Sequence, residues 1–284
     1  MLVYADAHTH TNPVRGMGMK IVAEKFRAKN GWFMAIVGLA PWSYGLTPNV
    51  EGYIKSFELV LRECDIARQK GLKVACILGV HPADIDKLVY RYGLKLEDAL
   101  NLVYKVIDIV IDMCKQGRID GIGEIGRPHY RIDPVFVTAA ELVMLRVMEA
   151  VKDYECVLHL HLEQGGMITV ESIEKLAKLV RLRMDKVIFH HSRPGLLDYV
   201  LTRGYNATIP GIEAVLRVVF SKHKPVYMVE SDHIDDPHRP GVVVYPWQLI
   251  ENQIKLLKEG LIDEEYLYKV NVDNVVRTYG IEPP

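Results

Sequence analysis

The stretch LVYADAHTH, residues 2–10, combines a short apolar run with polar side chains at its end. A helical pattern follows over residues 16–29, and a second apolar run, WFMAIVGLA, occupies 32–40. Continuous apolar runs separated by helices are typical of parallel sheets, because such strands are covered on both faces. The pattern therefore predicts that residues 2–8 form the first strand of a series of β–α units.

The same unit recurs along the chain. Further strand candidates lie at 72–80, 119–124, 155–161, 186–190, 205–209 and 225–230. Helical patterns lie at 51–70, 84–116 (with a break expected near Gly93), 134–152, 168–183, 194–203 and 211–223. Eight such units predict an α/β fold, a (β/α)8 barrel formed by residues 1–284 as one domain. A final helical pair, 246–259 and 263–278, either caps the barrel or forms a homo-oligomer contact, and the sequence leaves this open.

Composition narrows the class of protein. Apolar residues make up 49% and charged residues 25%, which is typical of a globular protein, and the net charge of -1 provides no global basic field for nucleic acid. The start lacks the features of a signal peptide, and no apolar stretch is long enough for a membrane span. Cys64, Cys76, Cys114 and Cys156 have no CxxC spacing, so we expect buried reduced thiols in a cytoplasmic protein.

Six predicted strands end in side chains that can bind metal. Barrel enzymes place catalytic residues at the C-terminal ends of their strands. Seven of the 11 histidines lie at these ends, which chance does not readily explain. The six ends read Asp6-Ala7-His8-Thr9-His10, Gly79-Val80-His81-Pro82, Gly123-Glu124-Ile125-Gly126, His159-Leu160-His161-Leu162-Glu163, His190-His191-Ser192 and Glu230-Ser231-Asp232.

The spacing of the first pair predicts chelation. His8 and His10 are two residues apart on a strand, so both rings point to the same side and can bind one ion. Imidazole and carboxylate ligands together suit Zn²⁺, Mn²⁺, Fe²⁺ or Ni²⁺. The loop after the last strand adds His233, Asp235, Asp236 and His238, which we expect to be solvated.

Four of these stretches resemble, in order and separation, the motifs of the TatD-like metal-dependent hydrolases, which belong to the amidohydrolase-like barrels. They are the stretches that contain His8 and His10, His81, Glu124, and Asp232. The resemblance covers nearly the whole chain. Residues 156–163 and 230–237 resemble an archaeal branch of the family more than its bacterial deoxyribonucleases.

The resemblance implies two divalent ions, of Zn, Mn, Mg, Fe or Ni. His8, His10 and Asp232 would bind the first, Glu124 would bridge both, and His190 with a strand-5 histidine would complete the second. Both His159 and His161 are available on that strand. We favour His161, because it lies nearer the strand end and precedes Glu163 by two residues, with His159 supporting it one layer deeper.

The other residues receive roles from the same hypothesis. Asp232 is the general base and Glu124 the second catalytic residue, while Asp6 and Glu230 would orient imidazoles by accepting their second ring N–H. Alternatives remain: Asp6 as a buried structural carboxylate, Arg127 in a surface ion pair, His81 shaping a turn and His191 facing solvent. The expected substrate contacts are Arg127, His81, His191 and Arg193.

The function that fits best is hydrolysis of phosphoester bonds, in a nucleic acid, as by a deoxyribonuclease or phosphodiesterase, or in a small molecule. An amidase or lactonase is the neighbouring alternative, and a non-catalytic metal-stabilised barrel is the third. Related amidohydrolases bridge their ions with a modified lysine on strand 4. Here strand 4 carries Glu124 and no lysine, which favours the TatD-like reading.

Overall fold

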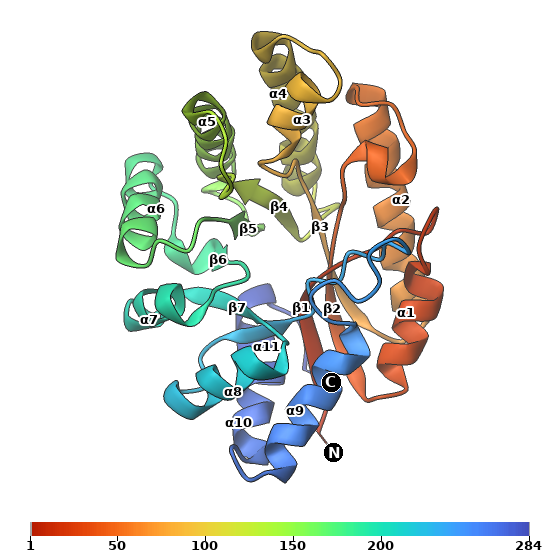
Figure 1. Cartoon of the computed structure of the whole chain (residues 1–284), viewed down its shortest axis with the longest axis vertical. Coiled ribbons are helices and arrows are strands. Elements are labelled where there is room, and N and C mark those ends of the chain that lie inside the picture. Colours follow the sequence, from red (N-terminus) through yellow and green to blue (C-terminus); the bar gives the residue numbers. More distant parts are fainter. Residues whose placement is uncertain (1, 284) are drawn as a thin grey trace.

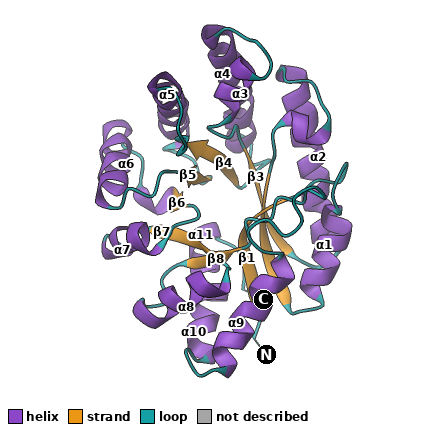
Figure 2. Cartoon of the chain, in the orientation of Figure 1, coloured by secondary structure: helices purple, strands orange, loops and turns teal. Residues whose placement is uncertain are grey.

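Eight parallel strands follow one another in sequence order around a single sheet (Figures 1 and 2). The computed structural model describes residues 2–283, so the two ends of the predicted 1–284 domain lie outside it. The strands are β1 (Tyr4–His10), β2 (Gly31–Val37), β3 (Lys73–Leu78), β4 (Gly121–Gly126), β5 (Val157–His161), β6 (Val187–Phe189), β7 (Asn206–Pro210) and β8 (Met228–Glu230).

The sheet closes just beyond β8. There the Asp232 N–H donates to the carbonyl of His8 at 2.9 Å, and the His10 N–H donates to the carbonyl of His233 at 2.8 Å. The result is the predicted single-domain (β/α)8 barrel, nearly closed, which confirms the fold class. Each predicted strand lies where a strand is found, with bounds that differ by a few residues.

Helices surround the strands (Figure 1). The expected break in 84–116 is confirmed, because α3 ends at Tyr90 and Gly93 adopts φ 75°, which suits glycine. The helices are α1 (Gly18–Arg27), α2 (Val50–Gln69), α3 (Asp84–Tyr90), α4 (Leu96–Lys115), α5 (Pro134–Val151), α6 (Met167–Val180), α7 (Pro194–Thr202), α8 (Glu213–Lys222), α9 (Pro246–Lys258), α10 (Glu264–Tyr268) and α11 (Asn274–Tyr279).

The final helices cap the barrel. The predicted helix 263–278 consists of α10, a π-helical turn at Lys269–Asp273, and α11. Val272 and Val275 are buried against side chains inside the barrel, among them Ala5 and Phe33. This packing fills the N-terminal end of the barrel and leaves the opposite end for chemistry. It confirms the capping alternative for residues 263–278, whereas α9 packs between α8 and α1, and an oligomer contact stays a prediction.

The four cysteines correct the sequence analysis. Cys64 of α2 is bonded to Cys76 of β3, and Cys114 of α4 is bonded to Cys156 just before β5. The prediction of reduced thiols is therefore wrong, and the cysteines give no support for a reducing compartment. The spacing of the cysteines in the sequence does not predict either pair. Each bond joins a helix to a strand region, and only the fold brings the two cysteines within about 6 Å of each other. The Cα–Cα distances are 6.2 and 6.1 Å.

Candidate metal centre

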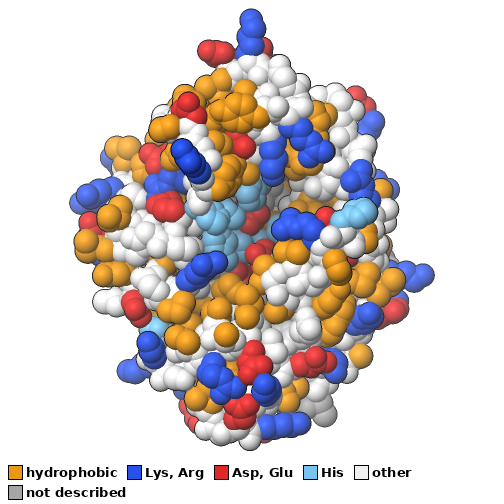
Figure 3. Space-filling model, in the orientation of Figure 1, with side chains coloured by type: hydrophobic (Ala, Val, Ile, Leu, Met, Phe, Trp, Pro, Cys, Tyr) orange, Lys and Arg blue, Asp and Glu red, His pale blue; other side chains and the backbone are white. Residues whose placement is uncertain are grey.

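Histidines and carboxylates gather at the floor of a hollow over the C-terminal ends of the strands, with lysines and arginines around it (Figure 3). Glu124 of β4 lies at their centre and is only 7% exposed. Its Oε1 lies 3.0 Å from His190 Nε2, 3.3 Å from His161 Nδ1 and 3.5 Å from His8 Nε2, and its Oε2 lies 3.7 Å from His81 Nε2 and 3.9 Å from His10 Nε2. Residues far apart in the chain therefore converge on one carboxylate.

Two overlapping groups here could each hold an ion. One consists of His8, Glu124, His190 and Asp232, and the other of His81, Glu124 and His161. His10 lies beside the first group, with Nε2 3.7 Å from Asp232 Oδ1. Both groups contain Glu124, whose two oxygens could serve two ions.

Two buried nitrogens support this fit. Nε2 of His8 and Nε2 of His190 make no hydrogen bond within residues 2–283, and both face Glu124. The two rings are stacked with their centroids 3.6 Å apart. Buried polar atoms are rarely left without a partner, and imidazole with carboxylate is a common ligand set for transition metals. The residues present therefore fit a divalent metal ion.

The partner of Nδ1 in each ring decides whether Nε2, the nitrogen that faces the centre, carries a proton or a lone pair. Nδ1 of His10 lies 3.2 Å from the carbonyl of Val37, and Nδ1 of His190 lies 2.7 Å from Glu230 Oε2. Both partners can only accept, so each Nδ1 carries the proton. When the rings are neutral, Nε2 of His10 and of His190 presents a lone pair to the centre. Glu230 thus contacts an imidazole in the way expected of it.

In His81 and His191 the ring proton is on the other nitrogen, Nε2, because Nδ1 accepts a hydrogen bond. Nδ1 of His81 accepts the N–H of Ala83 at 3.0 Å, and Nδ1 of His191 accepts a side-chain N–H of Gln164 at 3.3 Å. A neutral imidazole has one N–H, so in both rings it is at Nε2. His81 Nε2 points towards Glu124 and His191 Nε2 towards His161. These two histidines are therefore hydrogen-bond donors to the centre, a geometry that disfavours their binding an ion.

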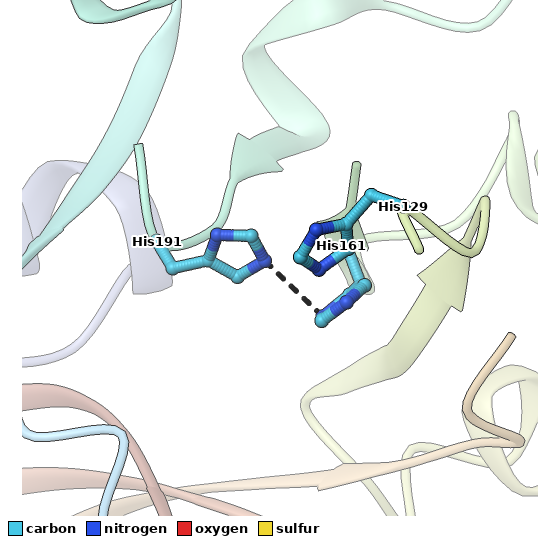
Figure 4. Close-up of side chains that lie close together, drawn as sticks. All are labelled: His129, His161 and His191. Atoms are coloured by element: carbon cyan, nitrogen blue, oxygen red, sulfur yellow. Dashed lines mark hydrogen bonds between the residues drawn. The ribbon is translucent and has the colours of Figure 1, made fainter. Parts of the chain in front are cut away.

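A third group of potential ligands, His129, His161 and His191, lies at the rim (Figure 4). His191 Nε2 lies 3.2 Å from His161 Nδ1. The Gln164 side chain is held by donating to the carbonyl of Leu162 at 3.3 Å and accepting the N–H of Arg193 at 2.9 Å. Because Gln164 keeps the proton of His191 on Nε2, this group is a poor ion site.

The charges of the centre support the same picture. Burial alone would raise the pKa of Glu124, but His81, His161 and His190 lower it well below its ordinary value. Burial and the neighbouring His190 lower the pKa of His8 well below its ordinary value. Burial would lower the pKa of His190, but Glu230 and Glu124 raise it well above the ordinary value. These shifts favour an ionised Glu124 among the imidazoles, and metal binding would release any proton that a ligand atom carries.

Two supporting residues lie elsewhere than expected. His159 bonds to His8 rather than to His161, with its Nδ1 2.9 Å from Nδ1 of His8. Asp6 accepts the backbone N–H of Ser231 at 2.8 Å and of His8 at 3.4 Å, and within residues 2–283 it makes no hydrogen bond to an imidazole ring. Burial raises the pKa of Asp6 to about 7. Asp6 therefore matches the alternative of a buried, hydrogen-bonded carboxylate.

The two arginines expected to contact substrate differ in placement. Arg127 is buried, and its guanidinium donates to both oxygens of Glu163 at 2.8 and 3.0 Å and to Glu141 at 2.8 Å. These ion pairs engage all three guanidinium nitrogens, which favours the structural alternative for Arg127. Arg193 is exposed at the residue before α7.

The cleft above the centre adds Trp42 and Lys87 to the residues expected from the sequence, where Arg239 is already a candidate cation. It has a volume of about 310 Å³, and Trp42, Lys87 and Arg239 line it together with His81 and Asp232. Lys87 lies on α3, and its Nζ is 5.9 Å from the ring centroid of Trp42. Its position six residues after His81, within the short helix that follows strand 3, was the available sequence clue.

Asp232 has an unusual backbone. Its φ is 49°, in the left-handed region that residues other than glycine rarely adopt, and its N–H donates to the His8 carbonyl. Strained backbone of this kind concentrates at functional sites. Oδ1 of Asp232 lies 3.7 Å from His10 Nε2 and 3.9 Å from His190 Nε2.

Fold and site together define a barrel of the metal-dependent hydrolase type. The sequence model of the family described as TatD related DNase matches residues 5–280. The chain therefore belongs to the TatD family. An uncharacterized protein of Methanocaldococcus jannaschii is 26% identical over 294 residues, covering 99% of this chain and 97% of the relative. The chain shares the fold of the family's metal-dependent hydrolases.

Solved structures share the architecture. The TatD-like protein from Archaeoglobus fulgidus has a TM-score of 0.66 at 18% identity, over 98% of this chain and 100% of that one. A TatD homolog from Escherichia coli K12 has a TM-score of 0.64 at 14% identity, over 98% of each chain. A mutant of a phosphotriesterase-like lactonase from Deinococcus radiodurans has a TM-score of 0.66 at 14% identity, over 99% of this chain and 96% of that one. At these identities the likeness establishes the fold alone.

Within residues 2–283, no helix is both long and apolar enough to cross a membrane.

Proposed function

We propose that this protein is a hydrolase with two divalent ions bridged by Glu124, and that it acts on phosphoester bonds. The observation that carries the proposal is the position of Glu124, buried among imidazole nitrogens from β1, β5 and the residues after β6. His8, His10 and Asp232 would hold the first ion. His161 and His190, both within 3.3 Å of Glu124 Oε1, would hold the second.

When bound, such ions lower the pKa of a shared water towards neutrality and stabilise negative charge on the substrate. Asp232 is the general base, because its carboxylate lies beside His10 and is open to the cleft, with 22% of its side chain exposed. It can accept the proton of the attacking water. His81 and His191 donate from Nε2, so they can hydrogen-bond a substrate oxygen that becomes more negative during the reaction.

The cleft favours an anionic substrate. Lys87 and Arg239 line it, and Arg193 is exposed after β6. Cations of this kind bind phosphate well, and a nucleic-acid phosphodiester or a small phosphoester would satisfy them. The net charge of the chain is only -1, so recognition would depend on these local cations.

The first test is metal content and substrate class. The purified protein is analysed for bound metal and assayed with a phosphomonoester, a bis-aryl phosphodiester, single-stranded DNA and lactones, with Mg²⁺, Mn²⁺ or Zn²⁺ added. We expect close to two ions per chain and metal-stimulated hydrolysis of a phosphoester. Lactone turnover alone would assign the site to the lactonase alternative, and bound metal without any turnover would support a non-catalytic barrel.

The second test is Asp232→Asn, compared with Asp236→Asn, a carboxylate of the same loop outside both ion-binding groups. Loss of a general base lowers turnover by about 10²–10⁴-fold. We expect that loss in Asp232→Asn with at least one ion retained, and near-normal turnover in Asp236→Asn. Full turnover in Asp232→Asn would refute the assignment.

A further inference from the structure

A chain of buried contacts joins the last helix of the barrel to the metal centre. The hydroxyl of Tyr279, the final residue of α11, lies 2.9 Å from His159 Nε2 and 3.2 Å from the carbonyl of Ala7. His159 Nδ1 lies 2.9 Å from His8 Nδ1. His8 and His159 are fully buried, so solvent does not compete for these contacts.

The contacts can all be hydrogen bonds in only one direction. A carbonyl only accepts, so the Tyr279 O–H donates to Ala7. The hydroxyl oxygen then accepts the N–H of His159, which must be at Nε2. A neutral imidazole has one N–H, so His159 Nδ1 is an acceptor and the proton between the two rings belongs to His8 Nδ1.

This direction prepares His8 for metal. With its proton on Nδ1, His8 presents a lone pair at Nε2, the buried atom that makes no hydrogen bond within residues 2–283 and faces Glu124. In the reverse direction the Tyr279 hydroxyl would donate to His159, and the Ala7 carbonyl would lose its bond. His8 would then carry its proton on Nε2 and could not bind an ion there.

We propose that Tyr279 is a positioning residue that, through His159, keeps the proton of His8 on Nδ1 and so makes Nε2 the metal ligand. The inference rests on the proposed metal centre. It also gives His159, the histidine of β5 that does not approach Glu124, a function of its own. Tyr279 also lines a cavity of about 800 Å³ together with Tyr205 and Arg277.

The first experiment removes one oxygen. Tyr279→Phe keeps the ring and lets His159 adopt either neutral form. Outer partners of metal ligands typically affect affinity by about 10–100-fold, so we expect a loss of at least about tenfold in Co²⁺ or Zn²⁺ affinity, measured by competition with a chelator dye. Tyr205→Phe is the matched control. It removes a hydroxyl from the same cavity that bonds Glu174 at 2.7 Å, and it should not change the affinity.

A second readout needs no metal. Long-range ¹H–¹⁵N spectra of metal-free protein with ¹⁵N-labelled histidine rings distinguish Nδ1–H from Nε2–H. In the unsubstituted protein we expect His8 with Nδ1–H and His159 with Nε2–H. In Tyr279→Phe we expect both rings to sample the other form.

Substitution of His159 separates positioning from packing. In His159→Asn a carbonyl oxygen can take the place of Nδ1 and accept from His8, so affinity should stay within a few fold. In His159→Leu the volume is similar but the acceptor is lost, so affinity should fall at least tenfold. Equal affinities in Asn and Leu variants, or an unchanged spectrum in Tyr279→Phe, would overturn the inference. Failure of the unsubstituted protein to bind any ion would overturn the proposed function instead, while the spectra would still test the hydrogen-bond direction.

Discussion

At the scale of single residues, the histidines of the centre differ in which nitrogen carries the proton. His10 and His190 donate from Nδ1 to oxygen acceptors, whereas His81 and His191 accept at Nδ1. The first pair is thereby prepared to bind an ion, and the second pair is prepared to donate to a substrate. Backbone and second-layer contacts, rather than residue type, divide one cluster of imidazoles into two chemical roles.

This division predicts the behaviour of His81. His81→Phe removes the donor, and loss of one such donor lowers turnover by about 10²–10³-fold. His81→Gln can place an amide N–H near the former Nε2 and should recover much of that loss. Metal content, measured on both variants, should equal that of the unsubstituted protein. Loss of an ion in both variants would show that His81 is a ligand.

The residue types of the site could be predicted from the sequence, but their partners could not. Strand alternation places His8 with His10, and His159 with His161, on one face each, and the barrel brings them to one rim. The pairing of His159 with His8 joins β1 to β5, which are not adjacent in the sheet. No local pattern encodes such a contact, so the sequence alone predicts that His159 supports His161, its neighbour on the strand.

At the scale of elements, the loop after β8 is less exposed to solvent than its polar sequence predicts. His233 and Asp235 are buried, so the expectation of a solvated loop is wrong for these two residues. The Asp235 carboxylate accepts the backbone N–H groups of Asn12, Met17 and Gly18 at 2.9, 2.7 and 2.9 Å. It therefore joins this loop to the loop between β1 and α1. Such a contact satisfies backbone groups that have no partner in a strand or helix.

Asp235→Asn should destabilise the protein. The amide nitrogen would face N–H donors, and loss of hydrogen bonds to a charged acceptor should lower the free energy of unfolding by about 2–3 kcal/mol. Urea unfolding of metal-free protein at pH 7 measures the change, with Asp236→Asn as the control. An unchanged free energy of unfolding would show that the loops are held by other contacts.

The stabilising effect of Asp235 should depend on pH. Burial would raise the pKa of Asp235, but His233 and the backbone N–H groups lower it below the ordinary 3.8. A carboxylate with a lowered folded-state pKa stabilises the fold above the unfolded-state pKa, and this contribution is lost as the pH falls through the folded-state value. The gap in stability between the unsubstituted protein and Asp235→Asn should therefore be constant above about pH 5 and narrow below 3.8.

At the scale of the whole molecule, the eightfold alternation of apolar runs and helices was enough to predict the barrel. Buried parallel strands need apolar residues on both faces, so their sequences stand out. The capping of the barrel by α11 and the two disulfides could not be predicted in the same way. No local sequence pattern marks Tyr279 or the paired cysteines. Tyr279 and His159 are 120 residues apart, and the cysteines of the two bridges are 12 and 42 residues apart.

The disulfides lead to a prediction about global stability. Each bridge restricts the unfolded chain, and the entropy it removes grows with the length of the closed loop. For separations of 12 and 42 residues the chain-entropy relation gives about 3 and about 4 kcal/mol. Cys64→Ala with Cys76→Ala should therefore lower the free energy of unfolding by less than Cys114→Ala with Cys156→Ala, as measured by urea unfolding without reductant.

Reduction provides the matched control for both pairs of substitutions. Dithiothreitol should lower the stability of the unsubstituted protein and leave a variant with all four cysteines replaced by alanine unchanged, because that variant has no bridge to reduce. Thiol titration of the unfolded, unreduced protein should detect no free cysteine, since both pairs would still be bonded. Detection of four thiols would show that the cysteines are reduced, and the helix-to-strand contacts they mark would then owe their stability to packing alone.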